Sequence, residues 1–537
     1  MASDTSLINR LCNVRKDAES IMEISGTPGA AIAVMHEGEL VHSEYLGLRD
    51  RENQLPVDEE TIFPCASLTK AVFSAAMAIC VEEGLFDWNT PVKDIVPGFH
   101  TQDETLHQQM TPVDCLSHRA GMQSTLYWVG SNNKILVPND KSLDFVNDLQ
   151  RVQRFRDYYL YNNLGYEIAS HILTNVSGGA WDEVLHKRIF EPLDMARTGT
   201  RAYFRADNVA KTYMTLDDAS NVEITPMLSG GDTVGGPGSA MRSCIKDLVK
   251  LYASFLNAGK HQFESGTTST PGSPLKQVPF LWSPKVSMNP ITFRETSYAL
   301  GWARVQTPGP MGAIGINPSL VAPSQVPLVG RGIPSRLILY HQGCMPGNLA
   351  AINLIPETRG AVLILTNSLA LNDAADWLGE LYLEAYLDVQ QKNDYVSLAQ
   401  VSARNALDWY PKLEAELSRT KSSEPPPREL LAYAGTYRNC ARTIVLQVLV
   451  NDQSGSLNVM FEGLEDEVWT LFHNHADVFT WLVPRNTLAR RGRFTTSWFD
   501  SEYFKFNFYT HPDEHHILGL TWKHDPSLCG PQRFIKE

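Results

Sequence analysis

The chain has 537 residues, several times the usual domain size of about 100 to 200 residues, so at least two domains with a large buried core are expected. Hydrophobic residues make up 43% and charged residues 20% of the sequence, close to the averages of folded soluble domains, which excludes a mainly disordered or collagen-like chain. The net charge of −14 repels a polyanion on average, so no nucleic-acid partner is expected.

The N-terminal sequence and the cysteines indicate the compartment. The first ten residues lack the apolar run of a secretory signal, and no later stretch approaches the roughly 20 apolar residues of a membrane span. Eight cysteines are scattered without a Cys-x-x-Cys pair, which favours free thiols over a disulfide framework or a structural zinc site. We therefore predict a soluble, cytoplasmic protein with no membrane partner, no metal and no cofactor, and the sequence is compatible with a homo-oligomer.

The first 85 residues predict a hairpin followed by a helix. Two β-rich runs, at 30–34 and 40–45, are joined by a His-Glu-Gly-Glu turn and so predict a hairpin that opens a sheet. After Ser67, small and apolar residues recur at steps of three and four residues, and Gly84 then supplies a stop signal. A buried helix is therefore expected directly after Ser67.

The middle of the chain is predicted to be mainly helical. Residues from about 110 to 255 carry mostly helical patterns, broken by glycine clusters such as 235–238, and we expect an inserted helical region over about 85–255. The segment 261–278 is rich in Ser, Thr, Gly and Pro, which predicts an exposed loop or insertion. Strand signals return in three short apolar or β-branched runs, at 337–340, 350–355 and 361–365. An antiparallel sheet opened at the N-terminus and completed after residue 335 would enclose the helical region as an insertion.

A proline run marks the clearest boundary in the sequence. The three prolines at 425–427 cannot continue a helix and form a stiff spacer. Several short strand-like runs then follow without a long helical pattern, which predicts a small β-barrel or sandwich; these runs are 443–449, 457–461, 478–482, 503–509 and 516–522. We therefore expect a larger domain over residues 1–420, a proline-rich linker over 421–428 and a β-barrel domain over 429–537.

Ser67 and Lys70 form a Ser-x-x-Lys pair at the start of the predicted helix. A serine hydroxyl needs a nearby group to take its proton and donors to stabilise the oxyanion that develops. The three-residue spacing places Lys70 on the same helix face, and burial would lower its pKa enough for it to act as a base. The same spacing occurs four more times, starting at Ser131, Ser243, Ser273 and Ser418. For any isolated copy, a helix-capping serine followed by a surface lysine is the simpler interpretation.

Two further motifs follow Ser67 in chain order. Tyr161 can serve as a phenol or phenolate near a cation, and the Asn163 amide can orient both a substrate and the lysine. His341 follows the apolar run 337–340, which places it on a strand, and Gly343 lies where a ligand can approach the backbone closely. Each motif alone has a structural alternative, a buried tyrosine anchor or a histidine packed on a sheet.

Together and in this order, the three motifs resemble those of the serine β-lactamase and penicillin-binding protein superfamily, and most closely its class C and esterase-like branch. The similarity covers about residues 20 to 390 and includes the sequence around Ser67, the segment 111–122 and the segment 161–166. The segment 429–437 is similar to the start of a lipocalin-like domain that often follows this catalytic domain. The resemblance implies an α/β (α+β) fold, with an antiparallel sheet flanked by helices and a small β-barrel at the C-terminus.

The resemblance also implies roles for individual residues. Ser67 would be acylated. Lys70 and Tyr161 would share the general base and acid work, and Asn163 would position the substrate. The backbone N–H groups of Ser67 and Cys344 would form the oxyanion hole.

Two other groups of residues have weaker claims. Trp302 is a candidate for an apolar substrate pocket together with Trp128 and Trp181, although core packing is the commoner role of tryptophan. A metal hydrolase built on His511, His515 and His516 is a weaker alternative, because these residues lack further ligands at a recognised spacing.

The third motif decides between substrate classes. It reads His-Gln-Gly here, where β-lactamases usually have Lys-Thr-Gly. Lysine offers a fixed charge to a carboxylate, whereas histidine is mostly neutral at pH 7. We therefore expect a serine hydrolase acting on an ester or amide bond of a small molecule through an acyl-Ser67 intermediate. The alternatives are an acyltransferase in small-molecule biosynthesis that uses the same site, and a non-catalytic ligand-binding protein.

Overall fold

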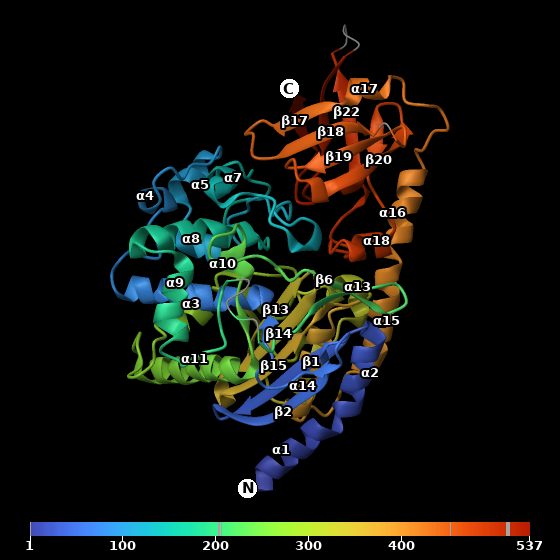
Figure 1. The fold of residues 1–537 in the computed structure, drawn as a ribbon. Coiled ribbons are helices and arrows are strands. Elements are labelled where there is room, and N and C mark those ends of the chain that lie inside the picture. Colours follow the sequence, from blue (N-terminus) through green and yellow to red (C-terminus); the bar gives the residue numbers. More distant parts are fainter. Residues whose placement is uncertain (1, 202–204, 206, 452, 512–515) are drawn as a thin grey trace.

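The computed structural model describes residues 2–201, 205, 207–451, 453–511 and 516–537. Figure 1 shows two parts along the long axis of the molecule. A larger part of helices and sheet carries the N-terminus, and a smaller β-barrel carries the C-terminus at the opposite end.

An antiparallel sheet forms the centre of the larger part. Within the described residues its nine strands follow the order β3-β2-β1-β15-β14-β13-β10-β9-β8. The strands are β1 (Gly29–His36), β2 (Glu39–Asp50), β3 (Leu55–Pro56), β8 (Val286–Ser287), β9 (Thr296–Tyr298), β10 (Ala303–Gln306), β13 (Leu337–Met345), β14 (Asn348–Ile355) and β15 (Gly360–Thr366). The predicted N-terminal hairpin and the three late strands are confirmed. The sheet resumes at residue 286 rather than after 335, because β8 to β10 are too short to give a sequence signal.

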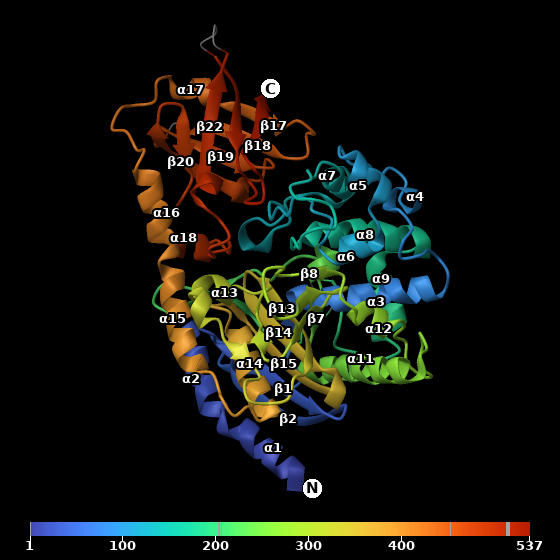
Figure 2. The ribbon, with the colours of Figure 1, turned by 180° about the vertical axis from the view of Figure 1, so that it is seen from behind.

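Helices cover both faces of this sheet, since every residue of β14 and β15 is buried. α14 (Ala374–Leu387) packs against these two strands, and α11 (Ile245–Ser265) packs against β1 and β15. The other long helices are α1 (Ala2–Asn13), α2 (Arg15–Ser25), α3 (Thr69–Glu82), α8 (Asn163–Ser177), α15 (Tyr395–Leu407) and α16 (Trp409–Ser418). α15 and α16 form a column that runs from the sheet to the barrel (Figure 2).

The region predicted to be mostly helical has most of its described residues outside helices, and apart from α8 and the start of α11 its helices are short. They include α4 (Val92–Ile95), α5 (Glu104–Gln109), α6 (Pro112–Leu116), α7 (Ser142–Asn147), α9 (Trp181–Leu185) and α10 (Gly236–Ser239). Two strands, β5 (Thr212–Thr215) and β6 (Asn221–Ile224), pair with each other there, and β5 also pairs with β16 (Ser368–Leu369).

The prediction of a loop at 261–278 is wrong for residues 261–265, which belong to α11. α11 continues to Ser265 and ends at Gly266, which has the left-handed φ of +65° that a glycine C-cap favours. Gln262 is buried, where its side-chain amide donates to the Leu275 carbonyl and its side-chain carbonyl accepts from the Val278 N–H. The last turn therefore gives no apolar periodicity, because its buried residue is the polar Gln262 and its apolar residue, Phe263, is exposed. α12 (Val278–Trp282) follows the loop.

The C-terminal part is a closed antiparallel barrel in the described residues, which confirms the predicted small β-barrel. Its strands are β17 (Gly435–Asn439), β18 (Val445–Asn451), β19 (Ser456–Phe461), β20 (Val468–His475), β21 (Val478–Thr480), β22 (Lys505–Thr510), β23 (Ile517–Trp522) and β24 (Gln532–Lys536). β17 pairs with β24 and closes the barrel. The boundaries proposed at 421–428 lie between α16 and α17 (Leu430–Tyr433), and the division into domains stays a prediction.

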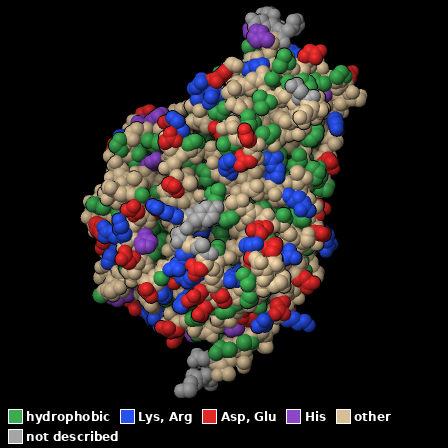
Figure 3. Space-filling model, in the orientation of Figure 1, with side chains coloured by type: hydrophobic (Ala, Val, Ile, Leu, Met, Phe, Trp, Pro, Cys, Tyr) green, Lys and Arg blue, Asp and Glu red, His purple; other side chains and the backbone are tan. Residues whose placement is uncertain are grey.

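The surface carries interspersed charges on the face drawn in Figure 3, where acidic and basic side chains lie next to one another. Among the helices of the described residues, none combines the length and the apolar character needed to cross a membrane.

Candidate active site

Ser67 lies on a tight turn between a strand and a helix. The short strand β4 (Phe63–Pro64) pairs with β7 (Arg242–Ser243), and the Cys65 N–H donates to the Met241 carbonyl at 2.8 Å. A 3₁₀ turn, η1 (Ala66–Leu68), then leads into α3. Ala66 has a φ of +45°, a region that costs a residue with a side chain about 1 to 3 kcal/mol. The pairing of β4 with β7 holds Ser67 just before the N-terminus of α3 in spite of this strain.

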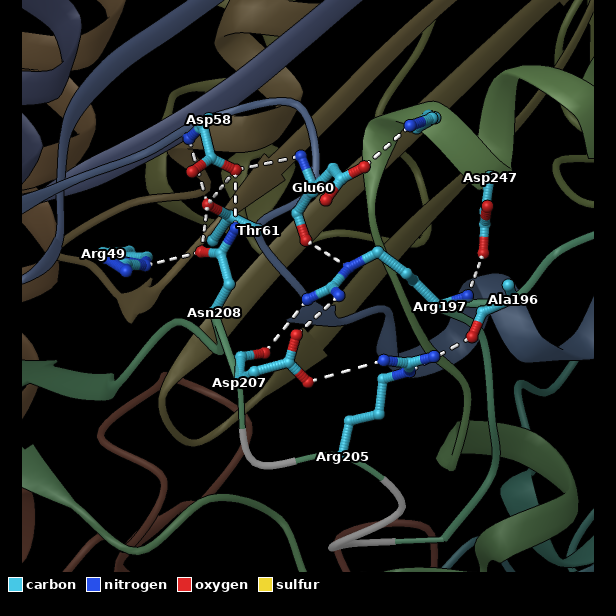
Figure 4. A network of polar contacts seen from close by, with 11 residues as sticks. Arg49, Asp58, Glu60, Thr61, Ala196, Arg197, Arg205, Asp207, Asn208 and Asp247 are labelled. Carbon is cyan, nitrogen blue, oxygen red and sulfur yellow. Dashed lines mark hydrogen bonds and ion pairs between the residues drawn. The ribbon is translucent and has the colours of Figure 1, made fainter.

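A polar network fastens the segment that leads to Ser67 (Figure 4). The Asn208 side chain accepts from Arg49 at 2.5 Å and donates to Asp58 at 2.8 Å. Arg197 donates to the Glu60 carbonyl at 2.9 Å. Residues about 140 to 160 positions apart in the sequence therefore fix the approach to the nucleophile.

Lys70 is completely buried on α3, one turn after Ser67. Its Nζ lies 3.0 Å from Ser67 Oγ, 2.7 Å from Asn163 Oδ1 and 2.9 Å from the Gly238 carbonyl oxygen. These three partners are uncharged, and burial holds the pKa of Lys70 well below its ordinary value. A neutral amine has a lone pair that can accept the Ser67 proton.

Tyr161 contacts Ser67 from the other side. Its hydroxyl donates to Ser67 Oγ at 2.8 Å, and Lys70 Nζ lies 5.0 Å from the centre of its ring. Burial raises the pKa of Tyr161 above its ordinary value, so the phenol keeps its proton near neutral pH. Tyr161 is therefore suited to donate a proton rather than to act as a phenolate base.

The third motif lies on β13, beside the turn that carries Ser67. A methyl group at Gly343 would lie only 2.6 Å from the Cys65 carbonyl oxygen, so glycine is needed for the strand to approach this turn. The close approach expected at Gly343 is thus made by the protein's own backbone.

His341 is buried and neutral in this arrangement. Its Nδ1 lies 2.6 Å from the Gln342 carbonyl and must carry a hydrogen, so its Nε2 accepts from the Tyr298 hydroxyl at 2.9 Å. Burial lowers the pKa of His341 to about 3. The third motif therefore offers no fixed positive charge to a substrate.

A model of the family described as Beta-lactamase matches residues 14–386. The chain belongs to this family. The family resemblance expected from the three motifs is thereby confirmed.

Curated relatives include hydrolases and penicillin-binding proteins. The unguisins hydrolase ungD of Aspergillus violaceofuscus is 27% identical over 470 residues, which are 76% of this chain and 71% of that protein. The putative penicillin-binding protein PbpX of Bacillus subtilis is 23% identical over 249 residues, which are 46% of this chain and 60% of that protein.

Solved structures show the same fold at low identity. An octameric penicillin-binding protein homologue from Pyrococcus abyssi matches with a TM-score of 0.56 and 18% identity over 98% of this chain and 100% of its own. A class C β-lactamase from Rhodobacter sphaeroides matches with a TM-score of 0.52 and 20% identity over 70% of this chain and 99% of its own. The β-lactamase-like fold predicted from the sequence is confirmed.

The structure brings together four of the residues predicted for catalysis in this Beta-lactamase family protein, Ser67, Lys70, Tyr161 and Asn163. Cys344, the penultimate residue of β13, is half-buried, and its role in the oxyanion hole stays a prediction.

Trp302 lies in the core, away from the position expected of a pocket residue. Its side chain is fully buried, and its ring packs edge-on against Tyr252 and Phe255 of α11 at 6.3 and 5.6 Å. Trp302 therefore packs in the core, which was the alternative to a place in the substrate pocket.

His118 adjoins the site but was not predicted. Its buried ring lies 4.3 Å from the Tyr161 ring and 4.7 Å from the Tyr298 ring, and its Nδ1 accepts from the Asn162 N–H at 3.1 Å. Burial holds the pKa of His118 well below its ordinary value. A neutral His118 thus packs against the ring of Tyr161. The only sequence signal for His118 is its position in the segment 111–122, which is similar to the family.

Within the described residues, no cluster of three or more His, Cys, Asp or Glu side chains is arranged to hold a metal ion. Of the three histidines considered for a metal site, His515 lies outside the described residues.

Proposed function

We propose that the protein is a serine hydrolase that cleaves an ester or amide bond of a small molecule through an acyl-Ser67 intermediate. The observation that carries the proposal is the position of Ser67 Oγ between two uncharged groups. The Lys70 amine, 3.0 Å away, can accept its proton, and the Tyr161 phenol, 2.8 Å away, can donate one. Such acid and base groups typically contribute factors of about 10² to 10⁴ in rate.

In the acylation step, the Ser67 oxygen bonds to the substrate carbonyl carbon while its proton moves to Lys70 Nζ. The carbonyl electron pair moves onto the oxygen, and we assign its stabilisation to the backbone N–H groups of Ser67 and Cys344. Loss of one such donor typically costs about 3 to 4 kcal/mol of transition-state stabilisation. As the adduct collapses, the bond to the leaving alcohol or amine breaks, and the leaving group takes the Tyr161 proton. Tyr161 regains a proton from the Lys70 ammonium.

In the second step, water attacks the acyl carbon and gives one proton to Lys70. The bond to Ser67 breaks, and the Ser67 oxygen recovers that proton. The enzyme returns to its starting state and a carboxylic acid is released. An alcohol or amine acceptor in place of water would turn the same steps into acyl transfer.

The third motif supports an uncharged acyl group. A buried, neutral His341 replaces the fixed charge that would pair with a substrate carboxylate. The relative named as a hydrolase of unguisins supports hydrolysis as the class of reaction.

The test is the mass of the intact protein after brief exposure to a fluorophosphonate. We expect one adduct on Ser67 in the wild type and none in Ser67→Ala. Ser418→Ala is the matched control, because Ser418 starts an exposed Ser-x-x-Lys of the same spacing. Equal labelling of Ser67→Ala, or no adduct in the wild type, would refute the proposal.

A panel of uncharged and carboxylate-bearing esters, with and without an added alcohol, then defines the reaction. Preference for the uncharged esters supports the assigned acyl group. Product partitioning between free acid and new ester separates hydrolysis from acyl transfer.

A further inference from the structure

We propose that the C-terminal barrel positions the catalytic lysine from a distance, through the segment 122–136 and the glycine-rich turn 235–238. The inference rests on the proposed function of Ser67 and Lys70, and adds a role for the barrel in the same reaction. The turn contacts the segment, and the segment contacts the barrel. Each of these contacts can be changed by a separate substitution.

The turn touches the reacting group directly. The Gly238 carbonyl accepts a hydrogen bond from Lys70 Nζ at 2.9 Å. A methyl group at Gly238 would lie 3.0 Å from Nζ and 3.6 Å from Asn163 Oδ1. The position of this turn therefore sets where the amine can lie.

Two side chains hold the turn. Glu167 is buried on α8, one helical turn after Asn163, and its Oε2 accepts from the Gly235 N–H at 2.8 Å. Trp128 covers the other side, because a methyl group at Gly235 would lie 2.4 Å from its ring. Trp128 is completely buried. A displacement of Trp128 would therefore release the turn on one side.

Tyr127, the residue before Trp128, enters the barrel. Its ring lies 6.0 Å from Trp522 and 6.4 Å from Phe461, both buried inside the barrel. Its hydroxyl donates to Glu462 at 2.5 Å. The side chain of Tyr127 thus belongs to the core of the barrel although its backbone belongs to the catalytic part.

A second carboxylate, the buried Glu467, holds the same segment four residues after Tyr127. The backbone N–H of Ser131 donates to Glu467, and its hydroxyl donates to Glu467 Oε2 at 3.1 Å. Glu467 is completely buried. Because Tyr127 and Ser131 flank Trp128, the barrel fixes this ring on both sides along the chain.

The end of the barrel next to this segment is filled. Side chains of the segment and of the barrel, including Leu126, Trp481 and Tyr503, leave a cavity of about 10 Å³ there, room for one water molecule. Contact with the catalytic part is thus a better account of this end of the barrel than binding of a ligand.

The experiment compares three full-length variants in the rate of Ser67 labelling by a fluorophosphonate. Tyr127→Phe removes only the hydroxyl bound to Glu462, and Trp128→Leu removes the ring from the turn. Tyr433→Phe is the matched control, because this barrel tyrosine also donates to a carboxylate, Asp477, at 2.7 Å. We expect Trp128→Leu to label about tenfold or more slowly, Tyr127→Phe to be intermediate, and Tyr433→Phe to match the wild type.

The pH dependence of labelling separates positioning from loss of stability. The titratable groups nearest the amine, Tyr161, Tyr166, His118 and His341, are held neutral by burial. Burial also raises the pKa of Glu167, which holds the turn, to about 7, so the acid limb is compared in a Glu167→Gln background in which Lys70 is the group that titrates. A loosened turn admits water, and the pKa of Lys70 rises toward its ordinary value. The acid limb should then move to higher pH in Trp128→Leu, whereas partial unfolding would lower the amplitude without moving it.

Hydrogen exchange gives a readout that does not depend on activity. Amides of residues 228–240 should exchange faster in Tyr127→Phe and Trp128→Leu than in Tyr433→Phe. If the wild type labels at Ser67 while all three variants match it in rate, acid limb and exchange, the proposed function stands and the role of the barrel is refuted. If the wild type does not label, both fall.

Discussion

At Lys70, burial and hydrogen bonding act in opposite directions. Three oxygen atoms within 3.0 Å of Nζ favour the ammonium form, but all three belong to uncharged groups. Removal of the amine from water disfavours the charged form and is the dominant effect, so the pKa of Lys70 falls. Each unit of that fall corresponds to about 1.4 kcal/mol between the two protonation states. Keeping this base neutral therefore lowers the folding stability of the protein.

Replacement of Lys70 by Met should separate these two effects. Met fills a similar volume without an amine, so the rate of Ser67 labelling should fall by a factor of about 10² to 10⁴. The melting temperature should stay the same or rise, because a buried polar group is removed together with its desolvation cost. Stopped labelling reactions and calorimetry measure the two quantities. Labelling within twofold of the wild type would mean that another group takes the proton.

The wild-type labelling rate should also increase with pH. Because the neutral amine is the active form, the rate follows deprotonation of Lys70, with a midpoint well below the ordinary 10.5 of lysine. A midpoint near 10.5 would contradict the burial argument.

Gly238→Ala tests the space beside the amine. The added methyl would lie 3.0 Å from Lys70 Nζ, so the amine has to move while the backbone of α10 does not. We expect labelling to slow by about 10- to 100-fold with a change in stability of less than about 1.5 kcal/mol. Gly530→Ala is the control, because a methyl group there meets open space. Unchanged labelling in Gly238→Ala would show that the turn does not constrain the lysine.

Among the elements, α14 carries several carboxyl side chains that are buried. Asp376, Glu380 and Glu384 are buried along it, and Asp373 caps its N-terminus by accepting from the Asp376 N–H at 3.0 Å. Gln342 of the third motif donates to Asp376 at 2.8 Å. Burial raises the pKa of Asp376 to about 6, and burial with the charge of Asp376 raises that of Asp373 well above its ordinary value.

These raised pKa values predict that stability falls as pH rises. Folding favours the protonated carboxyls, so their contribution is complete below the unfolded pKa of 3.8 and is lost as pH rises through about 6 for Asp376 and higher for Asp373. Asp373→Asn keeps the helix cap and removes one charge. Its melting temperature should exceed that of the wild type at pH 8, exceed it by a smaller margin at pH 5, and match it below about pH 3.8.

The control is Asp394→Asn at the cap of α15. Asp394 is exposed, and hydrogen bonds to Ser397 lower its pKa, so its contribution is present at pH 8. This variant should be slightly less stable than the wild type at pH 8. A gain of stability in both variants would point to a general effect of charge rather than to burial.

Elements with a strong local pattern could be predicted from the sequence, and elements fixed by distant contacts could not. The N-terminal hairpin, α3 and β13 to β15 have continuous apolar or periodic residues. The end of α11 was missed because its buried residue is the polar Gln262, which is held by the loop that follows. Lys70 and Ser67 are three residues apart, so their pairing follows from helix geometry, whereas Gly238 and Trp128 reach the site through packing between separate segments.

At the scale of the whole molecule, the two parts share buried polar contacts. Asp148 accepts from Asn439 at 2.8 Å, and Trp409 of α16 donates to the Phe499 carbonyl at 2.9 Å. The half-buried contact of Tyr127 with Glu462 and the buried contact of Ser131 with Glu467 lie in the same interface. Separation of the two parts would leave these carboxylates without their donors, and each unpaired group costs about 1 to 3 kcal/mol or more.

The two parts should therefore unfold together. Hydrogen exchange in increasing urea should expose β14 and β15 of the sheet and β18 and β19 of the barrel at the same concentration, and Ser67 labelling should disappear there as well. Glu467→Gln keeps the side-chain volume but replaces the charged acceptor at Ser131, and should lower the common midpoint without dividing the transition. If the barrel strands instead exchange at lower urea while Ser67 still labels at the full rate, the barrel is an independent unit. The interface contacts would then contribute to neither stability nor catalysis.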